Sequence, residues 1–158
     1  MCGRITKLRQ DQMPPGDCAG KGRFACAFES GDLQTRQVML TLRQHLCAQG
    51  IDDATLGTIE LVLAEVCNNV TEHGYAEAPG RIELILQQDG DALVCTVTDF
   101  GVPLPEGTPP TEPPGPPWSL PEGGFGWHII RTLTDRLEYR SEGGRNRLDL
   151  RIPILPMN

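Results

Sequence analysis

Near the middle of the chain, apolar side chains recur at positions i, i+3, i+4, i+7 and i+11. This spacing is the buried stripe of an amphipathic helix. It predicts a long helix that begins after an aspartate cap at Asp52 or Asp53, runs through 59–75, and ends at Gly74 as a C′ residue. A second apolar stripe predicts a shorter helix over 33–48.

Outside these helices the pattern changes to alternation of apolar and polar residues, which is typical of half-buried strands. This alternation predicts strands at 24–28, 82–86, 93–99, 137–139 and 148–152. One more helical stripe predicts a helix over 127–135. The order is strand, helix, helix, strand, strand, loop, helix, strand, strand. We therefore expect a two-layer α/β sandwich, in which helices cover one face of an antiparallel or mixed sheet.

Three polar residues, Glu65, Asn69 and His73, interrupt the edge of the long helical stripe at intervals of four. At about 100° per residue they share one face of the helix, beside the buried stripe. A half-buried carboxylate and carboxamide need polar partners. The Asn69 carbonyl oxygen is a hard ligand suited to Mg²⁺, and the Glu65 carboxylate is a candidate proton acceptor. The alternative is a helix whose polar edge simply meets solvent. We expect His73 to be a pocket-edge or core residue rather than a metal ligand, because no second histidine lies four residues away.

Residues 102–122 contain nine of the fourteen prolines in the chain. Proline removes a backbone donor and fixes φ, so this segment cannot form a regular helix or a central strand. A loop of this length inside a compact domain is commonly a lid or a binding loop, and the alternative is a disordered insertion.

Two glycine-containing motifs flank this loop. Asp99 lies on the apolar parity of its strand, so its carboxylate points to the core side, and Gly101 follows it. After the loop, a Gly-Gly-Phe-Gly run at 123–126 opens directly into a helix. Backbone N–H groups at such a helix start favour phosphate, although a short glycine run is also typical of a tight turn.

Composition narrows the classes of function. The 158 residues suit one domain, with 1–22 as a flexible lead-in and 23–158 as the folded part. A net charge of −7 argues against a nucleic-acid binder and permits a basic protein partner. The six cysteines lack metal-ligand spacing and indicate small core residues in a reducing compartment. Because we find no signal-peptide pattern and no membrane-length apolar window, we expect a cytoplasmic protein that does not enter a membrane.

Taken in order, these motifs resemble those of a known ATP-binding fold. Gyrase, heat-shock chaperone, histidine kinase and MutL-type ATPases, the GHKL superfamily, share this Bergerat-type fold. The chain is similar to them in Glu65-x-x-x-Asn69-x-x-x-His73, Asp99-x-Gly101 and Gly124-x-Gly126. Within the superfamily, passages 63–75 and 123–130 are most similar to the N box and the second glycine box of bacterial anti-sigma factor serine/threonine kinases. The resemblance spans about residues 24–153.

The resemblance implies a role for each matching residue. Glu65 would be the catalytic base that accepts the proton of a Ser or Thr hydroxyl, and Asn69 would ligate a Mg²⁺ ion that bridges the ATP phosphates. Asp99 would accept a hydrogen bond from the adenine amino group, and Gly101 would let the chain pass close to the base. The nucleotide site would be completed by His73, Gly123, Gly124, Phe125 and Gly126.

The resemblance also implies partners. Kinases of this family phosphorylate a STAS-type anti-sigma factor antagonist and sequester a sigma factor, and they usually form homodimers. The implied function is therefore partner switching in transcription regulation and stress response. The main rival is a nucleotide-sensing module that sequesters a regulatory protein without phosphotransfer. A detached histidine-kinase-type domain is a weaker rival.

Three departures from the family pattern affect the expected site. Val102-Pro103 follows Gly101 where relatives often carry a second glycine, and the proline-rich lid over 102–122 is longer than expected. Many relatives have Gly-Thr at the last strand, with the hydroxyl near the adenine. Here the strand begins Gly144-Arg145-Asn146, so either Asn146 substitutes for the threonine or the contact is missing.

Overall fold

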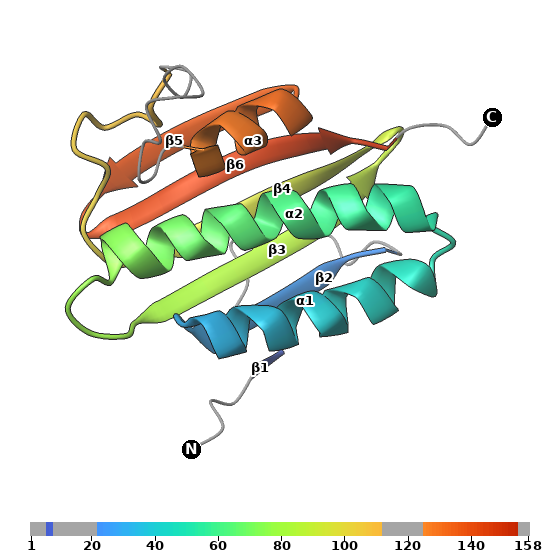
Figure 1. Cartoon of the computed structure of the whole chain (residues 1–158), viewed down its shortest axis with the longest axis horizontal. Helices are drawn as coiled ribbons and strands as arrows, with labels where there is room; N and C mark the ends of the chain where they lie inside the picture. The colour runs from blue at the N-terminus through green and yellow to red at the C-terminus, as the bar shows by residue number, and fades with distance from the viewer. Residues whose placement is uncertain (1–5, 8–21, 112–124, 155–158) are drawn as a thin grey trace, which may run out of the picture.

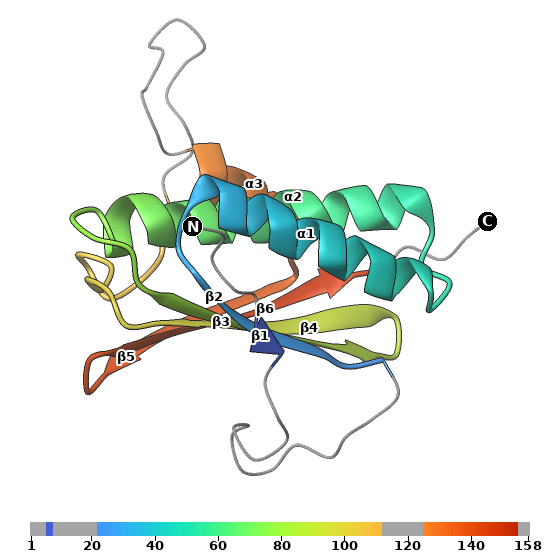
Figure 2. The same ribbon diagram turned by 90° about the horizontal axis from the view of Figure 1, so that it is seen from below.

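The computed structural model describes residues 6–7, 22–111 and 125–154 of the chain. These residues form two layers, a six-stranded sheet and a layer of helices that covers one of its faces (Figure 1, Figure 2). Every pair of neighbouring strands is antiparallel. The predicted two-layer α/β sandwich is confirmed, and the sheet is antiparallel throughout.

The strands lie across the sheet in the order β1-β2-β3-β4-β6-β5. Their bounds are β1 Thr6–Lys7, β2 Phe24–Glu29, β3 Arg81–Asp89, β4 Ala92–Asp99, β5 Arg136–Glu142 and β6 Arg145–Pro153. The helices are α1 Asp32–Cys47, α2 Asp53–Asn69 and α3 Phe125–Leu133, and a π-helical turn, η2 Val70–Gly74, follows α2 directly. Each of the five predicted strands and three predicted helices overlaps one of these elements.

The short strand β1 was not predicted. It lies within the segment 1–22, which was expected to be a flexible lead-in, and it pairs with β2 through Thr6↔Ala27 and Lys7↔Cys26. The outer edge of β2 offers unpaired backbone groups, and such an edge readily accepts another strand. Residues 1–5 and 8–21 lie outside the described part of the chain.

Helix α2 begins at a side-chain cap and ends through a change of helical geometry. At the start, the Asp52 carboxylate accepts hydrogen bonds from the Thr55 backbone N–H at 3.0 Å and from the Thr55 hydroxyl at 2.6 Å, as a helix cap does. At the other end, the helix widens into η2 and stops at Gly74. The expectation that the helical segment ends at Gly74 is confirmed, but Gly74 is its last helical residue rather than a C′ residue outside it, because the C-cap is Tyr75.

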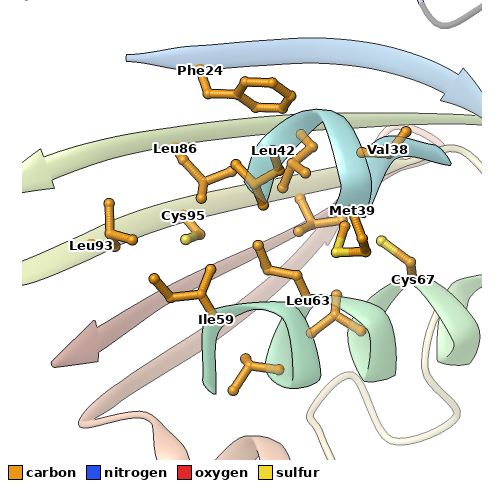
Figure 3. Packing of buried hydrophobic residues seen from close by; sticks show 14 of the residues in the cluster. Phe24, Val38, Met39, Leu42, Ile59, Leu63, Cys67, Leu86, Leu93 and Cys95 are labelled. Atoms are coloured by element: carbon orange, nitrogen blue, oxygen red, sulfur yellow. The ribbon is translucent and has the colours of Figure 1, made fainter. Parts of the chain in front are cut away.

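The core lies between the sheet and the inner faces of α1 and α2 (Figure 3). Leu42 and Leu63 from these helices are fully buried and belong to one hydrophobic cluster with strand residues such as Leu86. Cys26, Cys67 and Cys95 are also fully buried, as expected for small core residues. In the described ranges, no helix is long and apolar enough to cross a bilayer.

Candidate functional site

A cavity of about 500 Å³ opens where η2, the sheet, α3 and the start of the proline-rich loop meet. Its lining is mostly apolar, a character that suits a flat ring system held by a few polar groups. The apolar wall includes Val66, Val97, Trp127, Tyr139 and Leu148. Three polar residues of the sequence motifs also line it: Asn69, His73 and Asp99.

A larger hollow of about 790 Å³ lies over the helix-free face of the sheet. Its arginines are held by acidic neighbours, such as Arg136 by Glu138 at 2.8 Å. None of the predicted site residues lines this hollow. The sequence motifs therefore converge on the smaller, more apolar cavity.

Asp99 forms the polar end of the cavity, at the last position of β4. Its side chain is 7% exposed, and its Oδ1 accepts hydrogen bonds from the Gly101 N–H at 2.9 Å and from Asn146 Nδ2 at 2.8 Å. Burial raises the pKa of the Asp99 carboxyl, and the hydrogen bonds from Asn146 and Gly101 oppose that rise. The prediction that this carboxylate points to the core side is confirmed.

Gly101 is required by a backbone contact that the sequence did not indicate. A Cβ atom at Gly101 would lie 2.2 Å from the Gly74 carbonyl oxygen, and the next residue, Val102, donates its N–H to that same oxygen at 2.8 Å. Gly101 therefore lets the loop after β4 pass against the end of η2. Its predicted closeness to a base stays a prediction.

Glu65 and Asn69 meet the first turn of α3 at Gly126. A Cβ atom at Gly126 would lie 2.7 Å from Glu65 Oε2 and 3.4 Å from Asn69 Oδ1. Only a residue without a side chain fits there while Glu65 keeps its place. The structure thus brings the polar column of α2 to the glycine motif that sequence analysis predicted as a phosphate site.

His73 lies on η2, at the rim of the cavity, and it is exposed. His73 lies on the π-helical turn that begins at Val70 rather than on the α-helix of Glu65 and Asn69, yet it lines the same cavity as Asn69. Glu65 does not line the cavity, and its carboxylate lies beside it, facing Gly126 as Asn69 does.

Gly123 and Gly124 lie outside the described residues. Phe125 begins α3, two residues before the predicted helix start, and its side chain is 49% exposed. Phe125 does not line the cavity. Its predicted role beside a nucleotide stays a prediction.

The described part of the proline-rich loop is fastened over the cavity by two residues that sequence analysis missed. The Tyr139 hydroxyl accepts a hydrogen bond from the Leu104 N–H at 3.0 Å. Arg131 on α3 donates to the carbonyl oxygens of Pro109 at 2.7 Å and Pro110 at 2.8 Å. Both interactions join elements distant in sequence, so no local pattern marked these residues. Residues 112–122 of the predicted lid lie outside the described part.

A nucleotide with a metal ion fits this donor set. Asn69 Nδ2 is buried and has no hydrogen-bond partner among the described residues, which is expected where a ligand completes the site. Asn69 Oδ1 is an oxygen donor of the kind that Mg²⁺ prefers. The described residues contain no cluster of three acidic, His or Cys side chains that could hold a metal, so the phosphates would have to supply further ligands.

Comparison with known proteins agrees with this geometry. The model of the histidine kinase-like ATPase domain family matches residues 28–152. Serine-protein kinase RsbW of Bacillus cereus (strain ZK / E33L) is 30% identical over 91 residues, which cover 54% of this chain and 57% of the relative. RsbW of Halalkalibacterium halodurans is 33% identical over 91 residues, which cover 54% and 56%.

The chain thus spans little more than half the length of the curated relatives it matches. The resemblance to GHKL ATPases and to anti-sigma serine kinases is confirmed as a relationship of sequence. Since the family match extends over most of the chain and includes Glu65, Asn69, Asp99 and Gly126, the protein belongs to the histidine kinase-like ATPase domain family.

Proposed function

We propose that the chain binds ATP with Mg²⁺ in the 500 Å³ cavity and phosphorylates a Ser or Thr of an anti-sigma factor antagonist. The names of its relatives, serine-protein kinases, support this choice of reaction. The observation that carries the proposal is the contact of Gly126 with Glu65 and Asn69 beside a cavity that ends at Asp99.

The cavity offers different chemistry at its two ends. At the Asp99 end, a buried acceptor faces apolar walls, which suits the amino edge of adenine. At the Gly126 end, the start of α3 and the Asn69 amide suit phosphates. A bound Mg²⁺ would neutralise phosphate charge. Asn69 would hold it, and His73 would lie at the rim of the site.

Glu65 is the residue that we assign to proton transfer. As the acceptor hydroxyl oxygen forms its bond to the γ-phosphorus, the bond between that phosphorus and the bridging oxygen breaks and ADP leaves. The hydroxyl proton passes to the Glu65 carboxylate. Gly126 has no side chain, and Glu65 Oε2 occupies the space beside it. The carboxylate therefore has access to the phosphate end of the site without touching the adenine ring.

The partners in this proposal are a sigma factor and a STAS-type antagonist, with the chain acting as a homodimer in the cytoplasm. A net charge of −7 suits a basic partner surface. The biological outcome would be regulation of transcription, including stress response, through the exchange of partners. No direct contact with nucleic acid is proposed.

The test separates binding from transfer. We expect Glu65→Ala to bind ATP with Mg²⁺ as the wild type does, because Glu65 does not line the cavity, and to lose transfer to a purified STAS-type antagonist by a factor of about 10² or more. Binding is measured by calorimetry and transfer by labelled phosphate. Glu60→Gln is the matched control, since Glu60 lies on the same helix and pairs with Arg43 at 2.9 Å.

Each other result has a defined meaning. ATP binding without transfer by the wild type would support the rival, a nucleotide-sensing module that sequesters its partner. An acid-labile phosphate on the product would indicate transfer to His rather than to Ser or Thr. Transfer retained by Glu65→Ala would remove the role of Glu65, and no ATP binding by the wild type would overturn the whole proposal.

A further inference from the structure

Three polar side chains form a hydrogen-bonded chain behind the Asp99 end of the cavity. Ser141 Oγ donates to Asn146 Oδ1 at 2.7 Å, and Asn146 Nδ2 donates to Asp99 Oδ1 at 2.8 Å. The same Nδ2 atom also donates to the Gly101 carbonyl oxygen at 2.9 Å. The register of the sheet places Asn146 of β6 directly between Asp99 on β4 and Ser141 on β5.

The direction of each hydrogen bond in this series of side chains is fixed. Carboxylate and carbonyl oxygens only accept hydrogen bonds, so the Asn146 amide must turn its NH₂ group toward Asp99 and Gly101. Its carbonyl oxygen then faces Ser141, whose hydroxyl donates to it. Asn146 is 2% exposed, so turning the amide over would leave buried groups without partners.

These hydrogen bonds also determine which oxygen of the Asp99 carboxylate remains available to a ligand. Both hydrogen bonds to this carboxylate from described residues fall on Oδ1, from Asn146 and from the Gly101 N–H. Asp99 lines the cavity, so Oδ2 is the oxygen free to meet a ligand. An ionised carboxylate oxygen accepts hydrogen bonds and cannot donate them.

We propose that Asn146, oriented by Ser141, is a positioning residue that makes the site selective for a 6-aminopurine nucleotide over a 6-oxopurine nucleotide. It holds Asp99 with Oδ2 as a fixed acceptor, which pairs with an amino group and repels an oxo group. This inference rests on the proposed function, in which the cavity takes ATP. It gives Asn146 a part that sequence analysis left open.

The test compares ATP with inosine triphosphate, which carries a 6-oxo group. Both are titrated with Mg²⁺ into the wild type and into Asn146→Asp and Ser141→Ala at mildly alkaline pH. Asn146→Asp keeps the shape of the side chain but turns a donor toward Asp99 into an acceptor. We expect it to lower the preference for ATP about tenfold, and we expect Ser141→Ala, which only frees the amide to turn, to lower it about threefold.

The ratio of ATP affinity to inosine triphosphate affinity distinguishes positioning from a merely structural role, because a general loosening of the site weakens the binding of both nucleotides equally. The matched control is Thr96→Val. Thr96 donates to Asp149 Oδ1 at 2.7 Å, also between strands β4 and β6, but on the helix-free face. This control should keep the wild-type ratio.

Two results would overturn the inference, and they are distinct. If the wild type prefers ATP and both variants keep that preference, Asn146 does not set selectivity, while the proposed ATP site stands. If the wild type binds neither nucleotide, the proposed function falls and the inference falls with it. Should Asn146→Asp fail to fold, Ser141→Ala decides, because Ser141 is exposed and its loss leaves the core intact.

Discussion

Asp99 ends β4 with a carboxylate that is 7% exposed and faces mostly apolar walls. Burial raises its pKa, so as pH rises the unfolded chain releases this proton before the folded one does. The group therefore lowers the free energy of unfolding as pH rises through the interval between its unfolded and folded pKa values. Binding of an amino group has the opposite dependence, because it needs the ionised form and is lost as pH falls through the folded pKa.

Because stability and amino-group binding depend on pH in opposite directions, Asp99→Asn should affect the two differently. We expect this variant to unfold at the same or a higher temperature than the wild type at neutral pH, because its amide oxygen can still accept from Gly101 and Asn146 without burying a charge. It should bind ATP at least about tenfold more weakly. Calorimetric unfolding and ATP titration across acidic to neutral pH measure both effects.

The control for this prediction is Asp89→Asn, which removes an exposed carboxylate at the end of β3 and should change neither quantity. The stability advantage of Asp99→Asn should vanish at low pH, where the wild-type carboxyl is already protonated. A variant that is several degrees less stable at neutral pH yet retains full ATP affinity would contradict the argument.

At the scale of elements, the site depends on how closely α3 approaches α2. The contact occurs in the first turn of α3, where Gly126 lies against Glu65 and Asn69 of α2. The obstacle to a side chain there is the end of Glu65, which can move, rather than backbone. By contrast, a side chain at Gly101 would meet the backbone of Gly74 at 2.2 Å and would force the loop away from η2.

We therefore expect Gly126→Ala to keep the fold and to lose function. Alanine has a higher helix propensity than glycine by about 1 kcal/mol, which offsets the cost of moving Glu65. The displaced carboxylate should lower phosphotransfer by a factor of about 10² or more, with thermal stability changed by only a few degrees. Labelled-phosphate transfer and thermal unfolding measure the two effects.

Gly57→Ala provides the matched control, because Gly57 lies within α2 and its Cβ atom would meet nothing within 4 Å. We expect this variant to be stabilised by about 0.5–1 kcal/mol and to retain full activity. If Gly126→Ala were as active as this control, the proposed role of the Glu65 carboxylate beside Gly126 in phosphotransfer would be wrong.

On the scale of the whole molecule, one core between the sheet and α1 and α2 holds the site elements in place. Cys26 lies on β2, Cys67 on α2 and Cys95 on β4, so the buried thiols of this core come from both the sheet and the helix layer. Burial raises the pKa of Cys26 and of Cys67 to about 12 and raises that of Cys95 as well. Cys47, at the end of α1, is exposed.

This distribution predicts which cysteines react in the native state. With iodoacetamide at mildly alkaline pH, Cys47 should be modified quickly, while the three buried thiols should react only as fast as the molecule unfolds. Mass spectrometry of peptides gives the rate for each cysteine. All four cysteines of the described residues should react together in concentrated guanidinium chloride, and fast native modification of Cys95 would contradict a single cooperative core.

Local patterns predicted every long element because periodicity and capping act within one or two turns of chain. Asp52 as the cap of α2, the apolar parity of Asp99, and buried Cys95 all follow from neighbours a few residues away. The same reasoning missed β1, because a two-residue strand has no pattern of its own and exists through its pairing with β2. It also missed the change to π-helical geometry at η2.

Local sequence patterns therefore specify the elements, their order and the polar residues that they carry. Which distant residues meet depends on the packing of the folded molecule. Asn146 lies beside Asp99, 47 residues away, because of the register of β4 and β6, and Gly101 is required by the passage of the loop against Gly74. Such contacts depend on packing and register, and no local preference of the chain encodes them.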